Sequence, residues 1–325
     1  MTETQTNDNP RANNNRSADR VGAVVVGVVD MNIGLVDVDS HNFPNLALMK
    51  ISSYHKARGD RVEWWNGLKH YDVVYKSKVF DDTYTQDMDY CINADEIIKG
   101  GTGYDLVNRL PDIVEHQYPD YTLYDIDKKA YGFLTRGCPR GCPFCIVKEK
   151  EGKTHTVAEI GEFWNGQSEI VLLDANILAG RDRERHLNEL AETGALIEFN
   201  QGLDIRLVDR DITTMLNKLR FKDIHFAWDN PVDDLSDCFE TYKRYATNRP
   251  HGTFGMVYVL ANYNSTTEQD LYRIYQLRDY GYDPFVMIYD KPNAPNITRQ
   301  IARWCNNKWI FKQCERFEDY RKTKA

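Results

Sequence analysis

Short apolar runs alternate with segments of helical spacing through the second half of the chain. The apolar runs predict strands at residues 130–135, 169–173, 196–200, 223–228, 253–260 and 284–289. The segments between and after them predict helices at residues 157–164, 183–193, 211–219, 235–245, 267–280 and 296–305. Six strand–helix units in succession predict parallel strands joined by right-handed crossovers. We therefore expect residues 128–305 to form a parallel (β/α)6 partial TIM barrel.

A smaller α/β unit is predicted before this region. Its pattern favours a helix at residues 45–58 and strands at residues 33–38, 61–65, 71–74 and 94–98. These elements predict a small, mostly parallel, Rossmann-like domain over residues 31–109, which ends near a glycine-rich turn. Residues 110–127 are expected to link it to the barrel.

The two ends of the chain lack such patterns. Residues 1–20 hold five Asn and no aromatic or branched aliphatic side chain, so we expect residues 1–30 to be a disordered tail, with Met31 as an alternative start. Residues 306–325 mix aromatic and basic side chains, which favours a packed C-terminal helix or a tail.

Composition narrows the class of protein. With 42% hydrophobic and 28% charged residues, the chain has a globular mixture, which excludes collagen-like and wholly disordered classes. Its formal net charge of −8 lacks the basic character of a protein that coats nucleic acid. The longest apolar run, residues 21–29, is too short for a membrane span of about 20 residues. Without a recognisable signal peptide, and with an odd number of cysteines, the chain is expected in the reducing cytoplasm, with no membrane partner.

Polar side chains follow the predicted strands. The positions are Asp174 with Asn176, Gln201 with Asp204 and Arg206, Asp229 with Asn230, Asn262 with Asn264, and Asp290 with Lys291. Any one of them could simply begin a loop. As a set they favour one site at the carboxyl ends of the strands, where parallel barrels carry their chemistry.

Three cysteines follow the first predicted barrel strand. Cys138, Cys142 and Cys145 are spaced Cys-x3-Cys-x2-Cys among glycines and prolines that favour tight turns. A structural zinc site would need a fourth ligand, such as His155, Cys238 or Cys314, whereas a 4Fe-4S cluster held by three cysteines leaves one iron open.

With Phe144 before the third cysteine, the loop resembles the signature of the radical S-adenosylmethionine (radical SAM) superfamily, Cys-x3-Cys-x-aromatic-Cys. The resemblance extends over residues 128–305 and implies one 4Fe-4S cluster on the three cysteines, with SAM at the open iron. Reduction by a donor such as flavodoxin or ferredoxin would release a 5′-deoxyadenosyl radical that takes hydrogen from a substrate. It also implies that backbone beside Phe144 faces the adenine.

The same resemblance suggests further SAM contacts. Asp174 and Asn176 lie where the family has a Gly-Gly-Glu-like segment that holds the methionine amino group, although this chain departs from that pattern. Gln201, Asp204 and Arg206 are candidates for SAM or substrate contacts, with an Asp204–Arg206 structural ion pair as the alternative. No catalytic side chain is assigned.

Residues 39–44 of the smaller unit resemble the Asp-x-His-x-x-Gly loop of cobalamin-binding domains, but Pro44 replaces the glycine. We therefore expect no cobalamin on His41, and instead a helix capped by Asp39 or Ser40. The segment 100–103 is interpreted as a tight turn rather than a phosphate loop, and the four scattered cysteines as unliganded thiols.

The leading hypothesis is a radical SAM enzyme with an unidentified substrate, with methyl or sulfur transfer among the reactions to consider. The alternative is a non-catalytic binding module stabilised by zinc or an iron–sulfur cluster.

Overall fold

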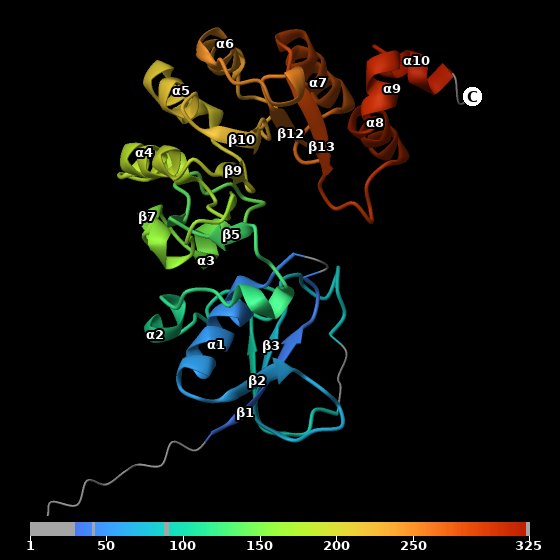
Figure 1. Cartoon of the computed structure of the whole chain (residues 1–325). Helices are drawn as coiled ribbons and strands as arrows, with labels where there is room; N and C mark the ends of the chain where they lie inside the picture. The colour runs from blue at the N-terminus through green and yellow to red at the C-terminus, as the bar shows by residue number, and fades with distance from the viewer. Residues whose placement is uncertain (1–29, 41–42, 88–90, 323–325) are drawn as a thin grey trace, which may run out of the picture.

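The computed structural model describes residues 30–40, 43–87 and 91–322 (Figure 1). Apart from Asp30, the tail predicted at residues 1–30 lies outside these ranges, as does His41. Two regions with parallel sheets follow each other along the chain, which confirms an α/β fold. None of the helices in the described ranges is both long and apolar enough to cross a membrane.

The first region is a four-stranded sheet in the order β2-β1-β3-β4. Its strands are β1 (Asn32–Asp37), β2 (Arg61–Trp64), β3 (Tyr71–Ser77) and β4 (Ala94–Gly100). Every neighbouring pair is parallel, so the predicted small parallel sheet is confirmed. The connecting helix α1 (Leu46–Ala57) packs against the sheet (Figure 1).

Asn45 caps α1. Its side-chain oxygen accepts a hydrogen bond from the backbone N–H of Leu48 at 3.2 Å, and its amide group donates to Ser77 Oγ at 2.8 Å. The prediction that Asp39 or Ser40 caps this helix is therefore wrong.

Asp39 is buried and stabilises a turn instead of capping a helix. Its two carboxylate oxygens accept the backbone N–H groups of Val79 and Phe80, each at 2.8 Å, and so fix the turn that follows β3. The segment 100–103 forms the tight turn predicted from the sequence. A side chain at Gly101 or Gly103 would meet the carbonyl oxygens of Lys78 or Phe80 at 2.3 or 2.2 Å, which only glycine avoids.

The second region contains two parallel sheets. One has the order β10-β9-β8-β5 and the other the order β11-β12-β13. The strands are β5 (Lys129–Gly132), β8 (Glu169–Leu172), β9 (Leu196–Phe199), β10 (Arg220–Asp223), β11 (His225–Ala227), β12 (Met256–Ala261) and β13 (Asp283–Ile288). Each strand pairs in parallel with its neighbours.

Where one strand is predicted at residues 223–228, the structure has two, and the first of them, β10, already begins at Arg220. The register against β9 shifts between Phe221 and Asp223, and Ile224 separates β10 from β11. After this irregularity the chain pairs with β12 instead, while Leu203 still bridges to Phe226. The division follows from this change of neighbours.

Five of the six predicted helices are present. They are α4 (Arg183–Thr193), α5 (Arg210–Leu216), α6 (Ser236–Tyr245), α7 (Thr267–Tyr280) and α8 (Asn296–Asn306). The helix predicted at residues 157–164 is wrong, because only the 3-10 turn η2 (Ile160–Glu162) forms there. Glu159 is still in extended backbone, at φ −90° and ψ 154°, and Phe163 leaves the helical region at φ −136°, so the turn is confined to the residues between them.

Shorter elements complete the region and its approach. They are α2 (Asp112–Glu115), η1 (Tyr121–Tyr124), β6 (Thr135–Arg136), α3 (Val147–Lys150), β7 (His155–Thr156), α9 (Lys308–Gln313) and α10 (Phe317–Lys322). The C-terminal segment thus forms two short helices rather than one. They pack on α8 through Trp304, whose ring centroid lies 4.9 Å from that of Phe311 and 5.7 Å from that of Phe317.

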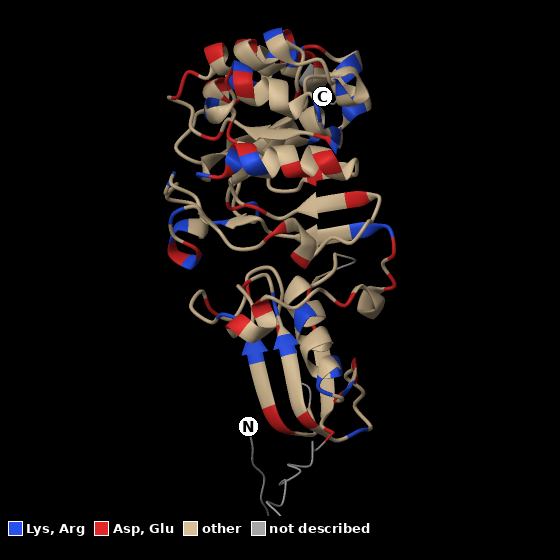
Figure 2. Cartoon of the chain, turned by 60° about the vertical axis from the view of Figure 1, so that its left-hand side comes forward, with Lys and Arg blue, Asp and Glu red and all other residues tan. Residues whose placement is uncertain are grey.

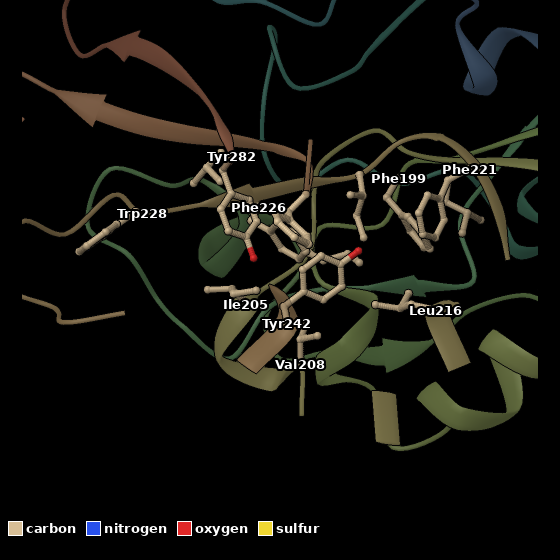
Figure 3. Close-up of a cluster of buried hydrophobic side chains, with 14 of the residues drawn as sticks. Phe199, Ile205, Val208, Leu216, Phe221, Phe226, Trp228, Tyr242 and Tyr282 are labelled. Atoms are coloured by element: carbon tan, nitrogen blue, oxygen red, sulfur yellow. The ribbon is translucent and has the colours of Figure 1, made fainter. Parts of the chain in front are cut away.

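An aromatic cluster fills the core beside β11 (Figure 3). The ring of Phe226 meets that of Tyr242 at 5.0 Å, and Tyr282 lies 5.0 Å from Phe239 and donates its hydroxyl to the Phe239 carbonyl at 2.9 Å. Burying each such side chain stabilises the fold by about 1.5–3 kcal/mol. In Figure 2, segments with acidic and with basic residues are interspersed along the helices of the second region.

Candidate functional site

The cysteine loop follows β5 and begins with the short strand β6. Gly137 has φ 86°, and a Cβ there would lie 2.4 Å from the Lys153 carbonyl oxygen, so only glycine fits. The returning strand β7 pairs with β6, and the N–H of Cys138 donates to the Gly152 carbonyl at 3.0 Å. The base of the loop is therefore held by backbone hydrogen bonds.

All three cysteines are half-buried free thiols. Burial raises the pKa of Cys142, and the nearby charges of Cys145, Asp229 and Cys138 raise it further. As the side chains stand, no three His, Cys, Asp or Glu residues in the described ranges form a group that could hold a metal ion. That arrangement describes a site for a single ion, whereas in a 4Fe-4S cluster each of the three thiolates would bind a different iron.

Asp174 and Asn176 both lie at the carboxyl end of β8 but face different partners. Asp174 is buried and accepts hydrogen bonds from Thr135 Oγ1 at 2.7 Å and from the N–H of Leu134 at 3.2 Å. Asn176 is also buried, and its Nδ2 lies 3.5 Å from Cys138 Sγ. Asp174 therefore anchors the start of the cysteine loop, while Asn176 reaches the loop's first thiol.

Burial raises the pKa of Asp174 to about 6, although its hydrogen bonds from Thr135 and Leu134 act in the opposite direction. Since the pKa is raised on folding, the folded chain binds the proton more tightly than the unfolded chain. This group's contribution to stability is present below about pH 4 and is lost as the pH rises to about 6. We expect the unfolding free energy of the wild type relative to Asp174→Asn to fall over this interval by at most roughly 1.4 kcal/mol per pH unit. Urea titrations across the interval measure it, and a pH-independent difference would contradict the raised pKa.

Asp204 forms ion pairs that connect the cysteine loop to the segment following β9. Its carboxylate contacts Arg140 Nε at 2.6 Å and Arg206 Nε at 2.7 Å, and Arg206 also contacts Asp233 at 3.1 Å. Burial acts to raise the pKa of Asp204, but the two guanidinium groups hold it below its ordinary value. The Asp204–Arg206 ion pair considered from the sequence is present. Gln201, which also follows β9, is exposed.

Two residues of this region, Arg140 and Arg273, are not among those expected from the sequence. Arg140 belongs to the cysteine loop itself, and its exposed position between prolines and glycines gave no sign of a partner. Asp229 belongs to the polar set expected at the carboxyl ends of the strands. Burial raises its pKa, and its charge acts on Cys142. Arg273 looked like an ordinary helix residue but is fully buried.

Three aromatic rings form a row that begins with Phe144 in the cysteine loop. The ring centroid of Phe144 lies 5.0 Å from that of Tyr263, which lies 4.8 Å from that of Tyr289. Tyr263 and Tyr289 directly follow the β12 and β13 region of the sheet. These contacts hold the side chain of Phe144 against Tyr263.

The first region contacts both α3, which follows the cysteines, and η1, which precedes β5. Lys150 Nζ donates to Thr102 Oγ1 in the glycine-rich turn, and Tyr124 Oη donates to Asp37 at 2.6 Å. Beside this second contact is a shallow pocket of about 330 Å³, lined by Asp37, Trp64 and Tyr124 among others.

Comparisons with known proteins assign no family to the chain. No family model matches it, and no curated protein matches its sequence. The functional argument therefore depends on the cysteine loop and the side chains around it.

Proposed function

We propose that this protein is a radical SAM enzyme whose six strand positions form one partial barrel. The observation that carries the proposal is the Cys-x3-Cys-x-Phe-Cys loop directly after the first strand of a parallel sheet. Only Ile224 separates β10 from β11, and this, with the bridge from Leu203 to Phe226, supports a single sheet. The chemistry of the donors also fits, because three thiolates suit a 4Fe-4S cluster with one open iron.

In this proposal Cys138, Cys142 and Cys145 hold the cluster. A bound and reduced cluster would supply the electron that cleaves SAM to a 5′-deoxyadenosyl radical, with an external protein such as a flavodoxin or ferredoxin as electron donor. The protein's own part is to bind and orient the nucleotide and to keep water and stray hydrogen donors away.

The buried amide of Asn176 is the best-supported contact for SAM. Its Oδ1 is buried and has no hydrogen-bond partner among the residues that the structure describes. A buried acceptor without a donor is costly, so a bound ammonium group at this oxygen would stabilise the site. Asp174 is already engaged with Thr135 and Leu134, and we assign it to holding the loop.

Arg206 is the second contact in the proposal. Although Asp204 occupies its Nε and Asp233 one of its terminal nitrogens, the guanidinium is part-exposed and its charge interacts with Cys142. A guanidinium in this place suits the carboxylate of the methionine moiety. Gln201 and the backbone beside Phe144 complete the proposed nucleotide contacts. We propose no cobalamin, and the reaction takes place in a reducing compartment.

The direct test is to purify the wild-type chain without oxygen, reconstitute it with iron and sulfide, and add SAM and a strong reductant. We expect about four iron and four sulfide per chain and formation of 5′-deoxyadenosine. Zinc in place of iron, or an intact cluster that leaves SAM uncleaved, would contradict the proposal and favour a binding module.

A further inference from the structure

The side chain of Asn176 faces a sulfur atom rather than the helix it precedes. Asn176 occupies the position before the 3-10 helix η3 (Ile177–Ala179), where an asparagine ordinarily accepts a hydrogen bond from the first turn. It makes no such bond here. Instead its Nδ2 lies 3.5 Å from the Sγ of Cys138, and only 3% of the residue is exposed.

The chemistry of the sulfur fixes which end of the amide faces it. A thiolate bound to a metal carries no proton, so it can only accept a hydrogen bond. The amide must then present its N–H group to Cys138, which directs Oδ1 away from the sulfur. That oxygen is the buried atom that lacks a partner within the described part of the chain. The two ends of one amide therefore serve two different purposes.

We propose that Asn176 sets the reduction potential of the cluster by donating a hydrogen bond from Nδ2 to Cys138 Sγ. This inference rests on the proposed function, since it requires a cluster on the three cysteines. A hydrogen bond to a ligand sulfur draws negative charge away from the cluster and stabilises its reduced, more negative state. Asn176 is thus a positioning residue that raises the potential, which eases electron transfer from the donor.

The test compares the midpoint potentials of reconstituted wild type, Asn176→Leu and Asn176→Asp. Leucine removes the N–H without adding charge, and aspartate keeps the shape but replaces the donor with a carboxylate. We expect both potentials to fall, Asn176→Leu by about 59 mV, which is a tenfold change in the oxidised-to-reduced ratio of a one-electron couple. Asn230→Leu is the matched control, because Asn230 follows a nearby strand but bonds Asp233 instead of a sulfur. Its potential should equal that of the wild type.

A second measurement uses only the wild-type protein, so it does not depend on a variant that still binds the cluster. In wild-type protein with 15N-labelled asparagine, pulsed electron paramagnetic resonance of the reduced cluster should detect one weakly coupled side-chain nitrogen. An unchanged potential in fully loaded Asn176→Leu, or no such coupling in the wild type, would overturn the inference. A wild-type chain that binds no iron and sulfide would overturn the proposed function instead, and this is seen before any variant is compared.

Discussion

Replacing Cys142 by alanine should abolish both cluster binding and SAM cleavage. Three sulfurs leave no spare ligand, so a chain with two of them cannot hold a 4Fe-4S cluster in a stable form. We expect iron and sulfide to fall to a small fraction of the wild-type content and 5′-deoxyadenosine to become undetectable. Absorbance near 400 nm, metal analysis and chromatography of the nucleosides measure these losses.

The control is Cys314→Ala. Cys314 is also a half-buried free thiol, but it lies between α9 and α10, and its Sγ contacts the Arg316 carbonyl at 3.2 Å. Its removal should leave iron content and SAM cleavage as in the wild type. If Cys142→Ala retained its cluster, or if Cys314→Ala lost it as completely, the assignment of the three ligands would be wrong. Circular dichroism separates loss of the cluster from loss of the fold.

The regular elements were predictable because their causes are local. Periodic apolar residues mark the strands, and signals such as the capping residues of α7 mark its start. The division of the strand at residues 223–228 was not predictable. It arises where β10 stops pairing with β9 and β11 begins to pair with β12, a tertiary event that leaves no trace in the spacing of apolar residues.

The candidate site was predictable to a similar extent. The cysteine spacing located the loop, and the polar residues after the strands located its surroundings. What the sequence could not provide was the choice of partners. Arg140 and Arg206 both contact the Asp204 carboxylate. Asp174 accepts a hydrogen bond from Thr135, whereas the side chain of Asn176 faces Cys138. These choices depend on side-chain directions and burial, which residue types alone do not determine.

Replacing Arg273 by methionine should destabilise the fold more than any surface substitution. Arg273 is fully buried in α7, and its guanidinium donates to the carbonyls of Trp228 at 2.6 Å, Asp229 at 2.8 Å and Leu260 at 3.0 Å. It also forms an ion pair with buried Asp270 at 2.6 Å. The residue therefore ties the carboxyl ends of β11 and β12 to the helix that covers them.

Methionine would fill much of the space but leave these acceptors without a donor and the Asp270 carboxylate buried without a cation. Breaking a buried pair in this way costs about 3–5 kcal/mol, and we expect a loss of that size in the free energy of unfolding, measured with urea. Arg303→Met is the control, since Arg303 is exposed on α8 and should change stability by less than about 0.5 kcal/mol.

The double variant Asp270→Asn, Arg273→Met distinguishes the ion pair from the carbonyl contacts. Neutralising Asp270 removes the unpaired buried charge, so the double variant should be more stable than Arg273→Met alone, although still less stable than the wild type because the three carbonyls stay unsatisfied. Equal stabilities of the single and double variants would show that the carbonyl contacts alone account for the loss.

Because Asp229 follows β11 and its charge acts on Cys142, iron retention should also decrease when Arg273 is replaced. Full retention of iron in a destabilised variant would mean that this end of the sheet does not position the cysteine loop.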